Sequence, residues 1–160
     1  MKREFSAGGL VYKKQGGRVV WLIRRPTGGK GYKGNLGWSF PKGWLDDIND
    51  GNDPGPLASG QIKASEDQLQ QAALKEVGEE GGVEARIVKK LSTLRTFFTN
   101  QEGEKVMKFI TYYLMEYRSD SPAGFGWETA ETKWIIGEEI KLLAHKNEKE
   151  LLVQALAMVK

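Results

Sequence analysis

The sequence has 160 residues and a formal net charge of +3, from 24 Lys and Arg against 21 Asp and Glu. That length predicts one domain, spanning residues 1–160, with a hydrophobic core of its own. Cysteine is absent, which excludes disulfides, thiolate zinc sites and a cysteine nucleophile. The single histidine, His145, excludes a histidine-rich metal site. The mild basic charge suits a polyanionic ligand but is too small to indicate a stable nucleic-acid partner.

No apolar run approaches the roughly 18 residues that a membrane span needs. The first residues, Met1 to Glu4, lead into no apolar secretory segment. We therefore expect a soluble, cytoplasmic protein with no membrane partner, while the oligomeric state stays open.

Two β-type segments open the chain, over residues 6–13 and 19–23, with a turn composition between them. The second is a continuous apolar, β-branched run, which is typical of a strand buried on both faces. Together they predict a hairpin. A Gly- and Lys-rich stretch follows over 26–37. Residues 46–64 are dominated by Asp, Asn, Gly, Pro and Ser, so we expect a loop of unusual length, either functional or disordered.

A helix is predicted from Ser65 to about Glu80. Ser65 can cap its first turn, and Gln68 three positions on completes a capping box. Gly81 and Gly82 supply a stop signal.

Two long β-type segments then cover 83–99 and 105–117, followed by a loop over 119–126 and a short strand over 132–136. The chain closes with a helix that Asn147 is expected to cap. The apolar stripe of that helix consists of Leu151, Leu152, Ala155, Leu156 and Val159. The pattern predicts a mixed α/β fold, with a sheet flanked by helices.

Three glutamates stand at unusual positions of the first helix. At 100° per residue, Glu76 and Glu80 continue the apolar stripe, and Glu79 lies at its edge. An ordinary amphipathic helix places carboxylates on the opposite side. A bound hard dication would remove the mutual repulsion of three carboxylates, because magnesium prefers oxygen ligands. The helical spacing alone equally allows Glu79 and Glu80 to be a solvated helix end.

Segment 75–83, KEVGEEGGV, resembles the second half of the Nudix box, G-x5-E-x7-R-E-U-x-E-E-x-G-U, where U is a bulky aliphatic residue. Lys75 stands where the family has Arg, and Asp67 stands where it has the first Glu. Between Gly43 and Asp67 lie 23 residues instead of five, which we interpret as an insertion within the box. Segment 38–43, WSFPKG, is similar to the family's entry into this loop.

The resemblance implies the Nudix α/β/α sandwich and water attack on a phosphorus of a nucleoside diphosphate linked to another group. By matching position, Glu76, Glu79 and Glu80 would bind Mg²⁺, with Mn²⁺ as a substitute, and the carbonyl of Gly43 would add an oxygen. Glu76 and Glu79 are also the catalytic candidates. Lys75 would orient the catalytic glutamate without the bidentate fork of arginine.

The Pro-Lys-Gly sequence at 41–43 is similar to that of Nudix enzymes that hydrolyse dinucleoside polyphosphates such as diadenosine tetraphosphate. Lys42 would then contact phosphate, as would Arg24 or Arg25, although strand alternation directs one arginine elsewhere. Glu128 occupies a position where those enzymes place a further glutamate that binds metal or activates water. Glu131 is the alternative. A surface position is expected for His145, and core packing for most of the aromatic candidates for base stacking, Phe97, Phe98, Tyr112 and Tyr113.

Two other functions stay open. One is a nucleoside triphosphate pyrophosphohydrolase that sanitises oxidised purine nucleotides, and the other is a non-catalytic Nudix module that senses a nucleotide. The G-x-G-x-x-G match at 29–34 precedes no predicted helix, so a dinucleotide-binding site is not expected there.

Overall fold

The computed structural model describes residues 1–28 and 37–159. The elements in chain order are β1 (Lys2–Gln15), β2 (Arg18–Pro26), β3 (Lys42–Trp44), β4 (Asp47–Ile48), β5 (Asp53–Pro54), α1 (Glu66–Gly81), β6 (Val83–Thr99), β7 (Lys105–Asp120), β8 (Thr129–Ile135), the 3-10 helix η1 (Gly137–Leu142) and α2 (Lys146–Leu156). The predicted elements are therefore present, most of them with longer bounds. The G-x-G-x-x-G match at 29–34 lies outside the described residues.

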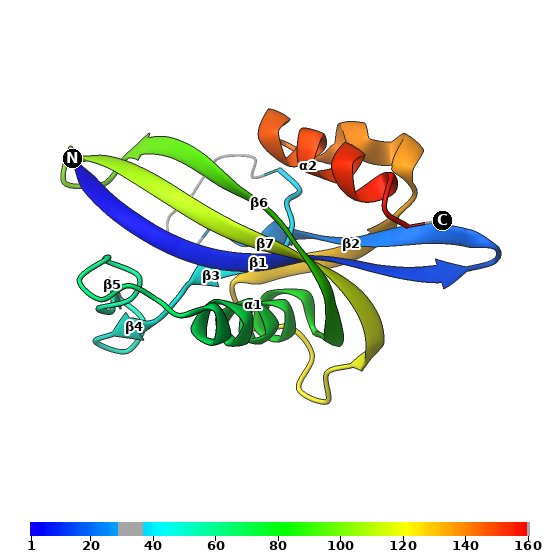
Figure 1. Ribbon diagram of the computed structural model, residues 1–160, viewed down its shortest axis with the longest axis horizontal. Helices are drawn as coiled ribbons and strands as arrows, with labels where there is room; N and C mark the ends of the chain where they lie inside the picture. Colours follow the sequence, from blue (N-terminus) through cyan, green and yellow to red (C-terminus); the bar gives the residue numbers. More distant parts are fainter. Residues whose placement is uncertain (29–36, 160) are drawn as a thin grey trace.

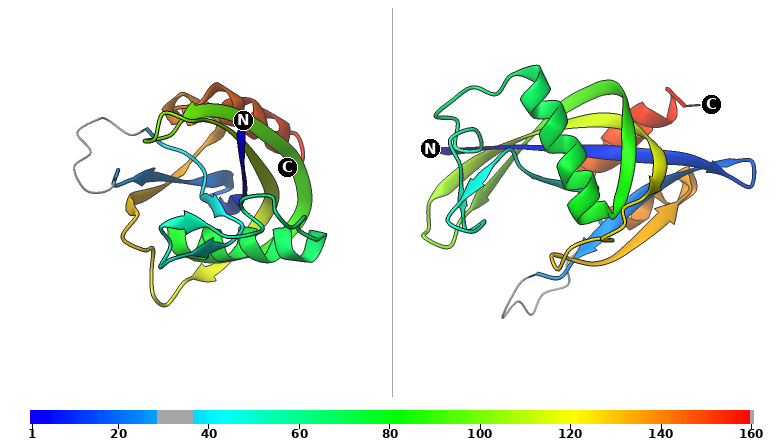
Figure 2. Two further views of the ribbon diagram at one scale, coloured as in Figure 1. Left: turned by 90° about the vertical axis from the view of Figure 1, so that its left-hand side faces the viewer. Right: turned by 90° about the horizontal axis from the view of Figure 1, so that it is seen from below.

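Strand β1 organises the sheet. In the described part of the chain, the sheet has six strands. Five of them follow the order β6-β7-β1-β2-β8, and the sixth, β3, pairs with β1. The β1–β7 pair is parallel, whereas β1 pairs with β2 and β3 antiparallel. The sheet is thus mixed. Helix α1 lies against one face and α2 against the other (Figure 1), and the view from below shows α1 crossing the strands (Figure 2). This is the three-layer arrangement that the sequence predicts.

Alternate residues of the strands form two cores. Trp21 and Ile23 pack in the core on the α2 side, whereas Leu22 packs in the core on the α1 side. Tyr112 and Tyr113 divide in the same way, and both are fully buried. The continuous apolar run over 19–23 therefore arises because β2 is covered on both faces, as predicted.

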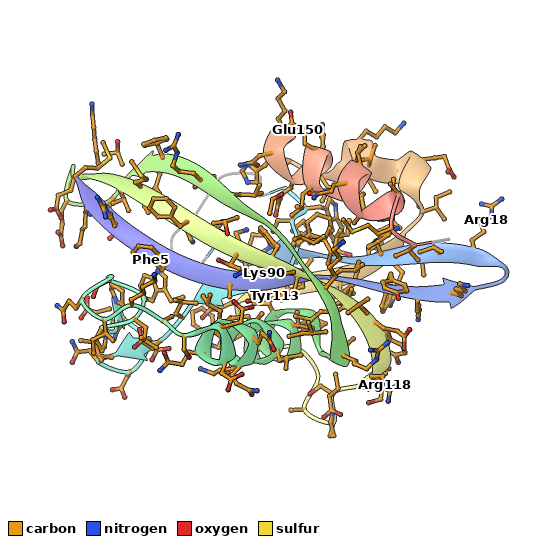
Figure 3. All side chains as sticks on the ribbon, in the orientation of Figure 1. Phe5, Arg18, Lys90, Tyr113, Arg118 and Glu150 are labelled. Atoms are coloured by element: carbon orange, nitrogen blue, oxygen red, sulfur yellow. The ribbon has the colours of Figure 1, made fainter. Side chains whose placement is uncertain are left out.

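Helix α1 begins and ends as predicted. The Ser65 side chain accepts a hydrogen bond from the Gln68 backbone, the Gln68 side chain accepts one from the Ser65 backbone, and Gly82 ends the helix with a φ of 71°. Tyr113 and Lys90, labelled in Figure 3, both donate to the Glu66 carboxylate in the first turn. The start of the helix is thus tied to β6 and β7.

The predicted cap of α2 is wrong by two residues. His145 is the N-cap, with no capping bond from its side chain, and Asn147 lies inside the first turn. The buried carboxylate of Glu148 explains the shift, because it accepts hydrogen bonds from Phe40 N at 3.2 Å and Tyr112 Oη at 3.1 Å. These tertiary bonds fix where the helix starts. The predicted apolar stripe is confirmed for Leu151, Leu152 and Ala155, which are buried. Leu156 and Val159 are partly buried against the same core, and Val159 lies beyond the end of the helix.

Segment 46–64 folds back onto the sheet. It contains the short β4–β5 hairpin, whose turn residues Asn49 and Asp50 have positive φ. The Asp46 carboxylate accepts hydrogen bonds from Leu57 N at 3.0 Å and Ala58 N at 2.7 Å. Ala58 is buried, and its carbonyl accepts from Phe5 N in β1. The segment is an ordered loop with its own turn and an anchor on β1.

Candidate active site

A cavity of about 560 Å³ opens where the C-terminal half of α1 meets β3, β7 and the loop before β8. That volume falls in the range of small-molecule sites. The turn between β4 and β5 borders it as well. The residues that line the cavity are Arg24, Lys42, Gly43, Trp44, Asp47, Gly51, Glu76, Glu79, Glu80, Lys108, Gly126, Trp127 and Glu128. Carboxylates and cations therefore face the same space.

The three glutamates of α1 occupy the positions that the helical spacing predicts. Glu80 is buried, Glu76 is partly buried, and the Glu79 side chain is 58% exposed. Lys75 lies one turn before Glu79, with its Nζ 3.8 Å from Glu79 Oε1. That contact suits the orienting role that the resemblance implies for Lys75. Asp67 is exposed near the start of the helix and does not line the cavity.

Glu76 carries the strongest electrostatic conflict in the cavity. The pKa of its carboxyl is raised from 4.5 to about 8. Burial is the largest cause, and the neighbouring carboxylates of Glu80 and Glu79 are the next largest. Only Lys75 acts in the opposite direction among the main contributors. A cation placed among these carboxylates would stabilise the ionised form of Glu76.

Gly43 makes the close approach of β3 to this carboxylate possible. A Cβ atom on Gly43 would lie 2.2 Å from Glu76 Oε2, well inside van der Waals contact. The β1–β3 ladder holds Gly43 opposite Ala7. The backbone of Gly43 and the side chain of Glu76 are thus held against each other, as a shared ligand set requires.

Glu80 is held by hydrogen bonds and by an ion pair. Its Oε1 accepts from Lys42 N at 2.9 Å and lies 3.5 Å from Arg24 Nε. Burial raises the pKa of Glu80, while Arg24 and Lys42 oppose that shift. Arg24 also donates to Thr129 Oγ1 at 3.2 Å and to the carbonyl of Glu128 at 3.0 Å. Arg24 therefore links the end of α1 to the loop before β8.

Two lysines add positive charge to the cavity wall. Lys42 Nζ lies 3.8 Å from Glu148 Oε1, on the side of α2. Burial lowers the pKa of Lys108, and the nearby ammonium of Lys42 lowers it further. Together with Arg24, these cations can bind the oxygens of a polyanionic ligand.

The donor set fits a hard divalent cation, because it consists of carboxylate and carbonyl oxygens. Within residues 1–28 and 37–159, however, no group of three His, Cys, Asp or Glu side chains is already arranged to hold an ion. Glu80 faces Arg24 and Lys42, and Glu79 faces Lys75. Joint binding of one ion by Glu76, Glu79 and Glu80 therefore requires these carboxylates to move closer together.

The remaining predicted residues divide between the cavity and the surface. Glu128 lines the cavity and contributes to the raised pKa of Glu76. Arg25 instead pairs with Glu131, with Arg25 Nη2 2.9 Å from Glu131 Oε1, and neither lines the cavity. Of the two arginines, only Arg24 lines the cavity. His145 is exposed, as expected.

The predicted aromatic candidates do not reach the cavity. Tyr112 and Tyr113 belong to the two cores, and Phe97 and Phe98 are exposed near the end of β6. None of the four lines the cavity among its described residues.

The sequence did not indicate six of the residues that line the cavity, which are Trp44, Asp47, Gly51, Lys108, Gly126 and Trp127. Lys108 could have been identified from the sequence, because it lies on the same face of its strand as the buried residues Ile110 and Tyr112. A charge at such a position predicts a functional or paired group. The other five lie at or near loops, where periodicity carries no information.

The mixed-charge cavity offers carboxylates for a divalent cation and cations for an anionic ligand. The NUDIX domain model matches residues 2–156. The chain therefore belongs to the Nudix family, whose hydrolases generally use divalent metal ions and act on small nucleotide substrates.

Comparisons with individual proteins agree with this family. The chain is 29% identical over 149 residues to MutT4 of Mycobacterium tuberculosis (strain CDC 1551 / Oshkosh), a match that covers 92% of the chain and 52% of MutT4. The chain thus spans about half the length of this relative.

Solved structures share the fold at low identity. A NUDIX hydrolase from Nitrosomonas europaea has a TM-score of 0.65 and 13% identity, covering 98% of this chain and 90% of that one. A binary complex of C. elegans Ap4A hydrolase has a TM-score of 0.60 and 22% identity, and the match covers 97% of this chain and 96% of that one. The NUDIX domain of Shewanella oneidensis NrtR, complexed with ADP ribose, has a TM-score of 0.62 and 14% identity, covering 100% and 90%. None of the helices in the described residues is long and apolar enough to cross a membrane.

Proposed function

We propose that this domain hydrolyses a phosphoanhydride bond of a nucleoside polyphosphate with the help of Mg²⁺. The observation that carries the proposal is the meeting of the glutamates of α1 with Lys42, Arg24 and Lys108 in one cavity of about 560 Å³. Carboxylates suit the dication, and the cations suit the phosphates that the dication would share. We further propose that residues 1–160 act as a single Nudix domain in the cytoplasm.

Glu76, Glu79, Glu80 and the carbonyl of Gly43 would hold the ion. When bound, it would neutralise phosphate charge and make an attacking water more acidic. The raised pKa of Glu76 and the closeness of Gly43 to its carboxylate support this set.

The reaction replaces one bond to phosphorus by another. The water oxygen forms a bond to phosphorus, the bridging P–O bond breaks, and the leaving phosphate takes the electron pair. The water proton passes to a carboxylate, either Glu79 or Glu128, which acts as general base. Both residues line the cavity. Lys75 would hold Glu79 toward this role, and Lys42 and Arg24 would bind the departing phosphate.

For the substrate, we propose a dinucleoside polyphosphate such as diadenosine tetraphosphate. The Pro-Lys-Gly sequence at 41–43 supports it, as does the fold shared with the C. elegans Ap4A hydrolase. A triphosphate pyrophosphohydrolase is the second candidate, favoured by the likeness to MutT4, which carries the name of a mutator protein. A purely sensing module is less favoured, because all three glutamates are retained.

A substrate panel separates these candidates. Dinucleoside polyphosphates, triphosphates, nucleotide sugars and capped RNA are incubated with Mg²⁺, and the products are separated by chromatography. ATP and AMP from a dinucleotide support the first candidate, whereas a monophosphate and pyrophosphate from a triphosphate support the second. Absence of turnover for the whole panel would leave the sensing module.

The variant Glu80→Gln tests the role of the glutamates. We expect a loss of several orders of magnitude in kcat with the fold retained, and loss of activity with a chelator. The matched control is Glu131→Gln, which changes an exposed glutamate outside the cavity. Near-normal turnover by Glu80→Gln would overturn the assignment.

A further inference from the structure

Trp127 is a large apolar side chain that the fold leaves in solvent. It is 76% exposed, and it lines the cavity beside Glu128. The other tryptophan of the cavity, Trp44, is partly buried and donates its Nε1–H to Glu4 at 2.9 Å. No ring pair or side-chain hydrogen bond in the described residues involves Trp127. One indole face thus stands free at the edge of the acidic wall.

The backbone around Trp127 is fixed on both sides. Gly126 N donates to the carbonyl of Glu79 at 2.7 Å. The carbonyl of Glu128 accepts from Thr27 N at 2.9 Å and from Arg24 Nη2 at 3.0 Å. The next residue, Thr129, is buried and donates through Oγ1 to the carbonyl of Glu80 at 2.8 Å.

These bonds tie Trp127 to the glutamates of α1. On one side, the preceding residue is hydrogen-bonded to the carbonyl of Glu79. On the other side, the two following residues are hydrogen-bonded to Arg24, which faces Glu80, and to the carbonyl of Glu80. The loop therefore presents the indole at a defined place beside the carboxylates. A free loop end would instead let the ring fold back onto apolar surface.

We propose that Trp127 binds the nucleobase of the substrate by stacking its indole on the base. The inference rests on the proposed function of the same cavity. A ligand that reaches both an aromatic face and the phosphate-binding cations needs a planar group joined to phosphates, which is a nucleotide. Stacking uses the face that every base has, so Trp127 supplies affinity without selecting one base.

The test compares two ligands that differ only in the base. AMP and ribose 5-phosphate are titrated into the whole protein with Mg²⁺ by calorimetry, so no turnover is needed. We expect wild type to bind AMP more tightly than ribose 5-phosphate. Trp127→Ala should weaken AMP binding by about tenfold to a hundredfold and leave ribose 5-phosphate binding unchanged. Trp127→Phe should restore most of the AMP affinity.

Phe125 offers a matched control in the same loop. It is 41% exposed but does not line the cavity, so Phe125→Ala should leave AMP binding unchanged. In turnover, Trp127→Ala should raise KM by a similar factor with kcat kept within about twofold. Quenching of the indole fluorescence by AMP should be reduced in that variant.

Equal binding of AMP and ribose 5-phosphate by wild type, including no measurable binding of either, overturns the inference. Unchanged AMP affinity in Trp127→Ala does so too. Failure of the proposed function has a different signature, since it is the absence of hydrolysis across the substrate panel. AMP binding that depends on Trp127 would survive that result.

Discussion

Glu76→Gln should stabilise the metal-free protein at alkaline pH while abolishing its activity. The folded state holds the Glu76 proton with a pKa of about 8, against 4.5 for an ordinary glutamate. At about 1.4 kcal/mol per pH unit of difference, ionising this carboxyl costs the fold about 4–5 kcal/mol. Glutamine has the same shape and no charge, so the variant avoids that cost.

The sign of the pH dependence follows from the raised pKa. The folded state binds the proton more tightly than the unfolded chain. The stability that protonated Glu76 contributes to the fold is therefore fully present below pH 4.5. This stability is lost as pH rises from 4.5 to about 8. Above that pH the effect of Glu76 on the free energy of unfolding no longer changes. The free energies of unfolding of wild type and Glu76→Gln should therefore diverge with pH, by up to about 1.4 kcal/mol per unit.

Urea unfolding with a chelator at pH 5, 6, 7 and 8 measures this difference. Groups that do not interact with Glu76 titrate equally in both proteins and cancel in the comparison. The control is Glu131→Gln, which changes an exposed glutamate outside the cavity, so its curve should follow wild type. Mg²⁺ without chelator should stabilise wild type more than Glu76→Gln. Parallel stability curves for wild type and Glu76→Gln between pH 5 and 8 would refute the reasoning.

Three further variants test the site's supports. Gly43→Ala places a methyl group against the Glu76 carboxylate; we expect about a hundredfold loss of kcat with unchanged circular dichroism. Glu148→Ala leaves the buried hydroxyl of Tyr112 without its acceptor, which should cost about 2–4 kcal/mol in chemical denaturation. Arg24→Met removes the cation beside buried Glu80 and should cost about 3 kcal/mol in the same assay. Wild-type stability in either of the last two variants would contradict the supporting roles of Glu148 and Arg24.

The predictable parts of this protein are those that depend on local pattern. The capping box of Ser65 and Gln68 set the start of α1, and the position of Glu76 and Glu80 on the apolar stripe located the cavity. Both signals lie within one helix, so no knowledge of distant contacts was needed.

Contacts between distant segments account for what could not be predicted. Glu148 is buried because it meets Phe40 and Tyr112, which lie 108 and 36 positions away. Because of that contact, the helix begins after His145 and not after Asn147, as the sequence had predicted. Trp127 reads as an ordinary loop residue until the hydrogen bonds of its neighbours to α1 are known. A single sequence carries no periodic signal for such pairs.

The long spacing between Gly43 and Asp67 is compatible with the site because each half of the sequence that resembles the Nudix box has its own anchor. Gly43 is held by the β1–β3 ladder opposite Ala7, and α1 packs against β1 through Val77 and Ala73. Both halves therefore meet on β1, whatever the number of residues between them. Loop-closure entropy rises only slowly with length, by about 0.6 kcal/mol per doubling, and the Asp46 carboxylate further closes the loop by binding the backbone at Leu57. The close approach of Gly43 to Glu76, which the proposed metal site needs, is present in this chain.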